Sequence, residues 1–480
     1  MTWISPKPAC FLIVLWSVLV HLPGLKSPLR DYHAYRQCQT ASMARNYVRH
    51  GMHFFSPEID TDGTPVRAGT EFPIYSYLLA ILFKLFGLKE VFGRLLSMIF
   101  AAWGAIFLYL FVRPRLGSWI ALWSALVMCA IPIHIYFTRT VQPEPMALWG
   151  YLGFLYFADL WMNREKERAY WVSAVLLGAL APLLKLPFLY LVFPMWLYLG
   201  YENGGTKKLM QKLWLAMMAL ILALVALWYH FAKTASVVLL PLSVQEHITN
   251  LLPALTWHLW VTQFVSHVPE LVTTYAGLLL GLLGLYYFRR AKALPLLLFW
   301  MLASVLYVPL LGEYGVIHRY TLLPLAPMAA VYIACGISAL WEYAKARPSY
   351  RILAGVLVLS IPLHAGLRIR HWYHLDYEYV LRAQKTLSAS SKPSDLVLVA
   401  SRETPELLYY LDHYGYPLDP ARKREGLLQD ISNKGGRYLL VPKEDNFKRL
   451  SEWKTVLTRK ARLLQDDPDY LLYQLSPRHG

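Results

Sequence analysis

The amino-acid sequence predicts a polytopic α-helical membrane protein with a small C-terminal α/β domain. Of the 480 residues, 56% are hydrophobic and 16% are charged, whereas a soluble domain carries about 25% charged residues. Apolar runs of roughly 18 residues or more recur over the first 367 positions, and runs of that length cross a bilayer. After about residue 368 the composition changes to that of a soluble domain.

About eleven segments are expected to cross the membrane as helices. The N-terminal segment is interpreted as an uncleaved first span, because it lacks a small-x-small cleavage site and has one lysine before its apolar core. The predicted spans are 9–24, 92–112, 117–136, 143–162, 169–183, 186–201, 211–232, 271–288, 293–311, 321–342 and 352–367. Within the first loop, 25–91, the apolar segment 73–87 is short for a span and predicts a helix at the membrane interface.

Basic residues in alternate loops predict the orientation. The positive-inside rule places these loops in the cytoplasm, together with the N-terminus. They carry Arg113, Arg115, Arg164, Lys166, Arg168, Lys207, Lys208, Lys212, Arg289, Arg290, Lys292, Lys345, Arg347 and Arg351. Loop 25–91 and the C-terminus are then extracytoplasmic, so the charged segment DYHAYRQCQTASMARNYVR (31–49) opposes the trend and is a candidate for function.

The C-terminal region predicts an extracytoplasmic α/β domain. Strands are expected over 394–401, 437–442 and 469–475, and helices over 404–415 and after Lys443. We therefore expect a transmembrane catalytic domain over 1–367, with the first outer loop 25–91, and a soluble domain over 368–480.

Composition and motifs exclude several classes of function. Much of the net charge of +17 follows from the positive-inside rule, so nucleic-acid binding is not expected. The four cysteines are scattered and are interpreted as packing residues. The sequence contains no GxxxxGK[ST], GxGxxG, HExxH or GxSxG motif, so nucleotide-driven transport and a zincin site have no support.

Charged residues in the predicted outer segments form the list of candidates. Arginine and lysine suit an anionic ligand such as a phosphate, and a carboxylate among them suits a general base. The candidates are Asp31, His33, Arg36, Arg45, Arg49, Arg67, Glu71, Arg139, Glu144, Lys185, His318 and Arg319. Structural roles stay open beside these: helix capping for Asp31, packing for His33, headgroup contact for Arg45 and Arg49, snorkelling for Lys185, turn termination for Glu144, and interface anchoring for His318 and Arg319.

Two stretches, RQCQTASMARN and GTEFPIYSYLLAILFKLFGLKEVFGRLLS, together with the acid that opens the first outer loop, resemble membrane glycosyltransferases of the GT-C superfamily. The resemblance is closest to bacterial family 39-like proteins, which are related to protein O-mannosyltransferases and to the aminoarabinose transferase of lipid A. It covers residues 30–370 best, and the order of several motifs carries it.

The resemblance implies roles for individual residues. Asp31 matches the catalytic base, Glu144 with Pro145 matches an acid–proline pair, and Lys185 matches a lysine near the lipid phosphate. Glu71 matches an acid before the interfacial helix. Phe72 and Tyr32 depart from the lysine and the acid found in the family, which argues against an aminoarabinose substrate and against a two-carboxylate metal site in the first loop.

The expected function is transfer of a sugar from a polyprenyl-phosphate donor to an acceptor hydroxyl, with inversion, at the outer face of a bacterial inner membrane. Arg36, Lys185 and Arg319 would stabilise the departing phosphate, with His33, Glu71, Arg139, His318 and Arg45 in support. A divalent metal bridging Asp31, Glu144 and the phosphate is an option, and no other cofactor is expected. Lipid, glycan and protein stay open as acceptors.

Two other functions fit the same membrane architecture. A transporter or flippase of a polyprenyl-linked glycan would place its charges near the membrane midplane, often in pseudo-symmetric halves. An O-antigen polymerase or ligase-like enzyme would share the chemistry and join larger glycans.

Overall fold

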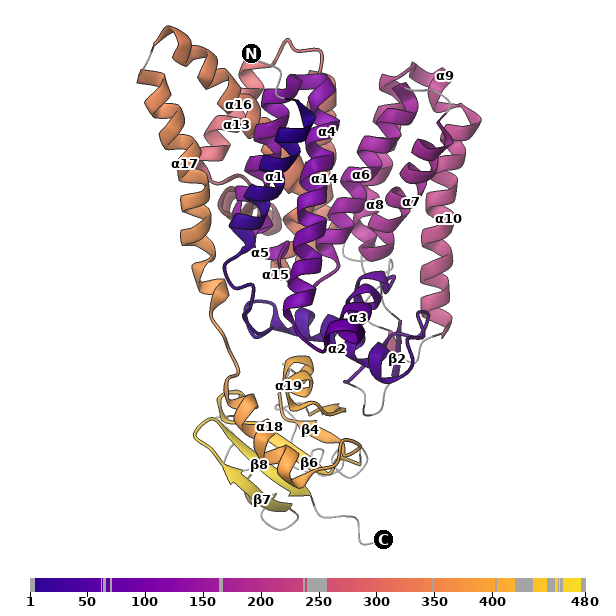
Figure 1. The fold of residues 1–480 in the computed structure, drawn as a ribbon, viewed down its shortest axis with the longest axis vertical. Helices are drawn as coiled ribbons and strands as arrows, with labels where there is room; N and C mark the ends of the chain where they lie inside the picture. Colours follow the sequence, from indigo (N-terminus) through magenta and orange to yellow (C-terminus); the bar gives the residue numbers. More distant parts are fainter. Residues whose placement is uncertain are drawn as a thin grey trace. The chain divides into compact units, whose positions relative to one another are not determined.

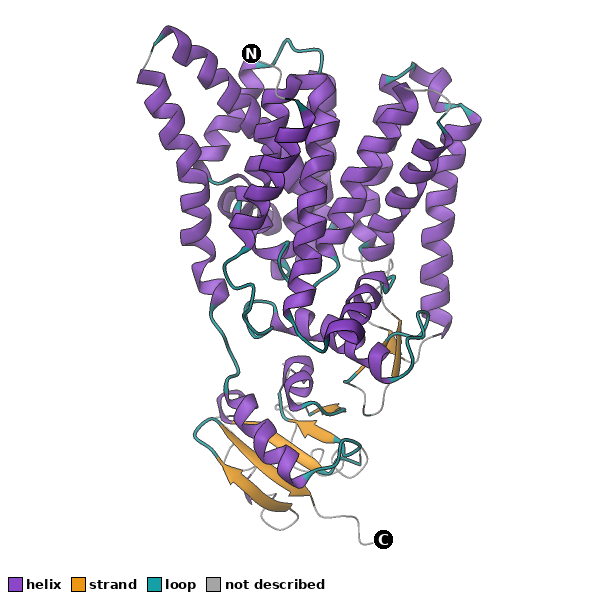
Figure 2. Ribbon diagram, in the orientation of Figure 1, coloured by secondary structure: helices purple, strands orange, loops and turns teal. Residues whose placement is uncertain are grey.

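The computed structural model describes residues 5–61, 63, 66–69, 71–163, 167–235, 238–239, 257–347, 349–401, 404–418, 435–446, 454–455, 457 and 461–475. Over these described residues it is mainly helical, with strands in two small sheets (Figure 1 and Figure 2). By internal contacts the chain forms two compact units. The helical unit comprises 1–25, 91–232 and 241–372, and the mixed unit comprises 26–90, 233–240 and 373–480.

Each predicted span coincides with helical structure in the helical unit. The elements are α1 (Pro6–His21), α4 (Val91–Ala130), α5 (Pro132–Phe137), α6 (Glu144–Asn163), α7 (Arg168–Leu184), η1 (Leu186–Phe188), α8 (Leu189–Glu202), α9 (Gly205–Leu209), α10 (Lys212–Ala235), α12 (Trp257–Val261), η3 (Thr262–Thr273), α13 (Tyr275–Tyr287), α14 (Leu294–Leu310), α15 (Gly312–Ile317), η4 (Arg319–Leu325), α16 (Ala326–Ala346), α17 (Ser349–Ile369) and η5 (Arg370–Tyr373). Gly117, with φ 85°, divides α4 where the second and third spans were predicted to meet.

Length and apolar composition alone select fewer spans than the predicted eleven. Among the described residues, four helices are long and apolar enough to cross a membrane, or five if one bent pair counts as a single span. Others, such as α1, α7 and α14, are apolar but have 16 or 17 residues. A membrane protein is therefore confirmed, while the number of spans stays a prediction.

Small residues allow the helices to pack closely. Helix α4 contacts α1, α6 and α16, and α13 lies along α16. A Cβ at Gly336 would lie 1.8 Å from the Leu280 carbonyl oxygen, and one at Gly284 would lie 2.5 Å from the Tyr332 carbonyl oxygen. Close backbone contact through glycine is the packing mode that membrane helices favour. We infer that these two glycines set the distance between α13 and α16.

Part of one predicted loop is helical. The predicted spans 211–232 and 271–288 leave 233–270 between them as a loop, but Trp257–Thr273 is helical and bends by 94° into α13. Thr274 adopts φ 60° at the bend, and its side chain accepts a hydrogen bond from the Gly277 N–H at 3.1 Å, which caps α13. Mixed polar and apolar residues over 257–273 gave a weak span signal, which explains the wrong prediction. Residues 240–256 of this loop lie outside the described residues.

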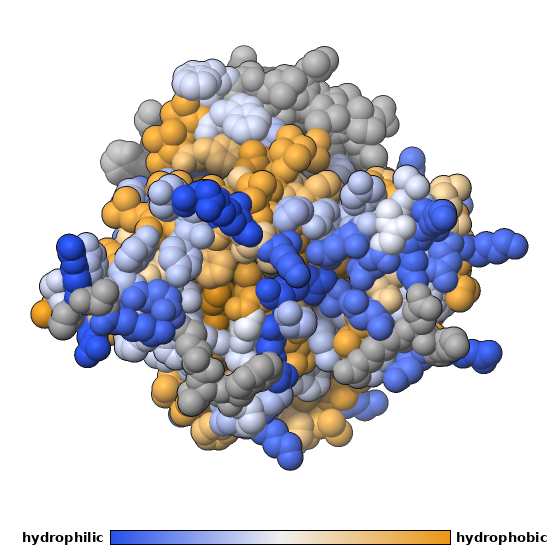
Figure 3. Space-filling view, turned by 90° about the horizontal axis from the view of Figure 1, so that it is seen from above, coloured by the Kyte–Doolittle hydropathy of each residue, from blue (hydrophilic) through white to orange (hydrophobic). Residues whose placement is uncertain are grey.

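Two turns that carry predicted cytoplasmic lysines and arginines lie at one end of the helical unit. The turn at α9 and the turn between α16 and α17 are at the same end as the N-terminus (Figure 1). Hydrophilic residues gather on that face (Figure 3), and Lys207, Arg290 and Arg351 are exposed. The grouping is the one that the predicted topology requires. Two of the predicted cytoplasmic residues, Arg164 and Lys166, lie outside the described residues.

The mixed unit joins the first loop to the C-terminal region. The first loop provides α2 (Ala34–Arg49), β1 (Glu58–Ile59), β2 (Val66–Gly69) and α3 (Ile74–Phe86), and β2 also pairs with β3 (Val238–Leu239). The predicted helix at 73–87 is α3. Helix α19 (Thr404–Leu411) of the C-terminal region packs on α2.

The C-terminal region contains a five-stranded sheet in the order β5-β4-β6-β8-β7. Its strands are β4 (Val397–Val399), β5 (Gly415–Pro417), β6 (Tyr438–Pro442), β7 (Ala461–Asp466) and β8 (Tyr470–Leu475). The other helices are α18 (Tyr379–Ser390) and α21 (Lys443–Asn446). The α/β character is therefore confirmed, and β4, β6, β8 and α19 lie where strands and a helix were predicted. β5 and β7 were missed because β5 has three residues and β7 has a polar, half-exposed pattern.

Candidate active site

Asp31 is buried at the start of the segment that leads into α2. Its exposed fraction is 1%, and its Oδ1 accepts a hydrogen bond from Gln37 Nε2 at 2.6 Å. Gln37 also donates to the Tyr32 carbonyl oxygen at 3.3 Å and has an exposed fraction of 0%. A buried carboxylate with a fixed donor has a defined orientation. The sequence did not identify Gln37, although its place in the first turn of α2 was a usable signal.

Helix α2 begins after Asp31. The N-cap is His33, which has φ 61° in the left-handed region and makes no side-chain capping bond. The His33 ring contacts Tyr32, with ring centroids 4.5 Å apart. Asp31 lies two residues before this N-cap, and packing describes His33.

Arg36 and Glu71 form an ion pair between α2 and the segment before α3. The Arg36 guanidinium also donates to Gln39 Oε1 at 2.9 Å. The two charged side chains are 16% and 13% exposed. A partly exposed guanidinium with further N–H groups can bind an anion without leaving its carboxylate partner.

Arg45 lies near the other end of α2 in a cluster of carboxylates. It contacts Asp60 at 2.6 Å and Asp412 at 2.7 Å, and its guanidinium lies over the Tyr409 ring. Burial alone would lower the pKa of Arg45, but Asp60 and Asp412 raise it. Arg49 also pairs with Asp412, at 2.8 Å. These contacts explain both arginines without a lipid headgroup.

In the helical unit, Glu144 and Lys185 form a buried pair. Lys185 Nζ lies 2.9 Å from Glu144 Oε1, and the two side chains are 13% and 4% exposed. Glu144 occupies the first turn of α6, where the helix dipole favours a carboxylate. Lys185 is the extended residue between α7 and η1, and its ammonium lies 5.4 Å from the centre of the Tyr320 ring. A cation paired in this way has a partner, so snorkelling alone does not explain it.

The segment TRTVQPEP, which ends at Pro145, is fixed by buried hydrogen bonds. Arg139 has an exposed fraction of 0% and donates to the Gly24 carbonyl oxygen at 3.1 Å. Ser97 Oγ donates to the Thr140 carbonyl oxygen at 2.6 Å. Arg139 also lies over the Tyr136 ring. The contacts give Arg139 a role in shaping the segment that leads to Glu144.

His318 and Arg319 lie between α15 and η4 and are half-buried. The His318 ring contacts Tyr314 and Tyr320, with ring centroids 4.2 and 5.5 Å apart. Tyr320 also lies beside Lys185. The structure therefore brings His318, Tyr320, Lys185 and Glu144 into one neighbourhood of the helical unit.

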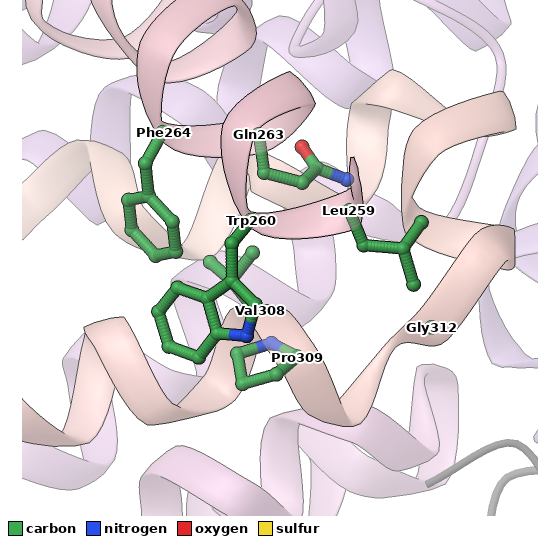
Figure 4. A pocket seen from close by; sticks show the side chains of 7 residues that line it. All are labelled: Leu259, Trp260, Gln263, Phe264, Val308, Pro309 and Gly312. Atoms are coloured by element: carbon green, nitrogen blue, oxygen red, sulfur yellow. The ribbon is translucent and has the colours of Figure 1, made fainter. Parts of the chain in front are cut away.

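An open apolar pocket lies beside the same segment. It is a shallow hollow with room for about one water molecule (Figure 4). It is lined by Leu259, Trp260, Gln263, Phe264, Val308, Pro309 and Gly312. Gln263 is 2% exposed and supplies the amide among these mainly apolar groups.

Lys185 occupies the place beside Glu144 that a predicted divalent metal ion would take. Lys185 already neutralises Glu144, so this carboxylate does not fit a divalent ion in the arrangement seen. Within the described part of the chain, no group of three or more His, Cys, Asp or Glu side chains is placed to hold a metal. We therefore derive no step through a metal, and the site predicted from Asp31 and Glu144 stays a prediction.

Comparisons with known proteins agree with the architecture. The profile of the family described as dolichyl-phosphate-mannose-protein mannosyltransferase matches residues 69–230. The comparison with curated proteins finds no match. The predicted resemblance to the GT-C superfamily is thus confirmed, as a resemblance, by a family profile over residues 69–230.

Solved structures share the fold over nearly the whole chain. ArnT from Cupriavidus metallidurans, bound to undecaprenyl phosphate, matches with a TM-score of 0.63 and 12% identity, over 98% of this chain and 99% of that chain. The oligosaccharyltransferase of Archaeoglobus fulgidus, tethered to an acceptor peptide, matches with a TM-score of 0.60 and 12% identity, over 98% of this chain and 74% of that chain. At such identity the comparison shows the fold.

Proposed function

We propose that the protein is an inverting glycosyltransferase that moves a sugar from a polyprenyl-phosphate donor to an acceptor hydroxyl at the outer face of a bacterial inner membrane. The observation that carries the proposal is Asp31, a buried carboxylate oriented by Gln37, in a chain with the fold of ArnT bound to undecaprenyl phosphate. The family profile over 69–230 supports the same class of enzyme.

Asp31 is proposed as the general base. It takes the proton of the acceptor hydroxyl as the hydroxyl oxygen attacks the anomeric carbon on the face opposite the phosphate. The bond between the anomeric carbon and the phosphate oxygen breaks, and the electron pair leaves with the polyprenyl phosphate. One displacement inverts the anomeric configuration. The energy comes from the sugar–phosphate bond, so the reaction needs no nucleotide.

Cations would stabilise the departing phosphate as its negative charge develops. Arg36 and Lys185 are held by Glu71 and Glu144, which limits the reorganisation needed when the anion forms. Arg319 is the third proposed contact, and His318 lies beside it.

The test is a transfer assay with purified protein in lipid nanodiscs. Donors would be radiolabelled hexoses and pentoses on undecaprenyl phosphate, and acceptors would be lipid, glycan and protein fractions of a bacterial envelope. The proposal expects one donor to lose its label to an acceptor, with release of undecaprenyl phosphate. Failure of every donor to react with every fraction would contradict it. The size of the labelled product would distinguish single-sugar transfer from joining of larger glycans.

One observation favours the transporter alternative. The helices Trp257–Thr273 and Tyr275–Tyr287 meet at 94°, and broken helices are common at transporter binding sites. A transporter would scramble labelled undecaprenyl-phosphate sugar across proteoliposomes without glycosyl transfer. Transfer without scrambling would exclude it.

A further inference from the structure

The backbone just before Asp31 is bound by residues that are distant in sequence. The Leu29 N–H donates to Tyr410 Oη at 2.7 Å and to Glu90 Oε2 at 3.2 Å. The Tyr410 hydroxyl in turn donates to Glu90 Oε1 at 2.9 Å. Tyr410 thus accepts one hydrogen bond and donates another, so its hydroxyl has a single orientation.

Arg30, the residue next to Asp31, is fixed in the same way. Its Nη1 donates to the Asp376 carbonyl oxygen at 2.8 Å, and the Asp376 N–H donates to the Arg30 carbonyl oxygen at 3.0 Å. The Cys38 thiol donates to the Leu29 carbonyl oxygen at 3.5 Å. Burial raises the pKa of Cys38 well above its ordinary value, so the thiol keeps its proton at neutral pH.

These contacts tie a short piece of backbone to the C-terminal region. Leu29 and Arg30 are 0% and 5% exposed. Tyr410 lies on α19, and its ring packs against the core formed by α18, α19 and the five-stranded sheet. Few torsions separate the fixed Leu29 N–H from the Asp31 carboxylate, so a shift at Leu29 displaces the carboxylate directly.

We propose that Tyr410 is a positioning residue for Asp31, through which the C-terminal region sets the place of the base. The inference rests on the proposed function and gives the C-terminal region a part in it. A misplacement of a reacting group by about 1 Å costs on the order of 100-fold in rate. Tyr410→Phe removes two of the three hydrogen bonds in this network and leaves the Leu29 N–H bonded to Glu90. We therefore expect a smaller loss of rate, about tenfold.

The test uses Tyr410→Phe in the full-length protein, since phenylalanine keeps the ring and removes the hydroxyl. The matched control is Tyr438→Phe. The Tyr438 hydroxyl donates to the Ser390 carbonyl oxygen in the same region, and Tyr438 is 2% exposed in the same core. Tyr438→Phe therefore reports what a lost buried hydroxyl does to the C-terminal region in general.

Two measurements are made in nanodiscs. Hydrogen–deuterium exchange should become faster in the peptide that contains the Leu29 and Arg30 amides for Tyr410→Phe, and should not change there for Tyr438→Phe. With the donor identified by the panel above, kcat should fall about tenfold for Tyr410→Phe while KM for the donor stays within about twofold. Tyr438→Phe should keep kcat within about twofold.

Several results would overturn the inference. Unchanged exchange at Leu29 would show that Tyr410 does not hold this backbone, and an unchanged kcat would show that holding it does not matter to the reaction. An equal loss of kcat in Tyr438→Phe would show that the effect comes from a general loss of stability in the C-terminal region. If Asp31→Asn is inactive while Tyr410→Phe turns over normally, only this inference fails. If Asp31→Asn itself turns over normally, the base assignment in the proposed function fails as well.

Discussion

The two ends of α2 use charge in different ways. At the C-terminal end, Arg45 and Arg49 face Asp60 and Asp412 at distances of 2.6 to 2.8 Å, and Arg45 is buried. At the N-terminal end, the buried carboxylate of Asp31 accepts a hydrogen bond from the neutral amide of Gln37. The C-terminal end pairs cations with anions. At the N-terminal end a neutral amide orients the carboxylate of Asp31, beside the ion pair of Arg36 and Glu71.

The difference indicates which end is available for chemistry. A buried arginine held by two carboxylates is expensive to disturb and suits a structural junction. An amide fixes the direction of a carboxylate without adding a positive charge. The same charged segment therefore contains a junction to the C-terminal region and a candidate catalytic group.

After Asp31, the largest change in rate is expected at Lys185. Lys185→Met should lower kcat by about 100- to 1,000-fold, because it removes a preorganised cation from the developing phosphate charge. Steady-state transfer from the undecaprenyl-phosphate donor measures it. Lys345→Met is the control, since Lys345 is exposed and pairs with Glu342. Equal rates in the two variants would remove Lys185 from the site.

The largest loss of stability is expected at Arg45, which joins α2 to the C-terminal region through Asp412. Arg45→Met should lower the free energy of unfolding by about 3 kcal/mol, because it leaves Asp60 buried without the cation that faces it. Urea denaturation in detergent, followed by tryptophan fluorescence, would measure the change. A midpoint equal to that of the unmodified protein would show that the cluster is not a junction.

A smaller loss of rate is expected at Gln37. Gln37→Leu should lower kcat by about tenfold, because the hydrogen bond that orients Asp31 is lost and the side-chain volume is kept. The stability of the variant, measured in parallel, should change by less than in Arg45→Met. A wild-type kcat would mean that Asp31 is oriented by other contacts.

The smallest effect is expected at Arg49. Its side chain and that of Asp412 are 36% and 47% exposed, and exposed ion pairs contribute about 1 kcal/mol or less. Arg49→Met should shift the urea midpoint only slightly and leave kcat unchanged. A loss as large as that of Arg45→Met would show that both arginines belong to one cooperative cluster.

The sequence predicted the helices well because long apolar runs in a membrane protein have few other folds available. It missed the helix over 257–273, whose residues include His258, His267 and Pro269 within the apolar pattern. It also identified Asp31 but not Gln37 or Tyr410. Both partners are identified by their contacts in the folded structure. Tyr410 is 381 residues from Leu29 in the chain, so no local sequence pattern indicates this contact.

The grouping of the first loop with the C-terminal region was equally invisible in the sequence. It depends on contacts such as Arg45 with Asp412 and Arg30 with Asp376, each of which joins residues more than 300 positions apart. Charge patterning identified the arginines, and only the fold identified their acidic partners.

The role of Asp31 as the base is tested by comparing Asp31→Asn with Asp60→Asn, which change two buried aspartates beside the two ends of α2. We predict that Asp31→Asn loses transfer while its urea midpoint and its binding of undecaprenyl phosphate stay near those of the unmodified protein. Asp60→Asn should lower the midpoint and retain transfer in the folded fraction. Near-normal turnover by Asp31→Asn would show that Asp31 is not the base.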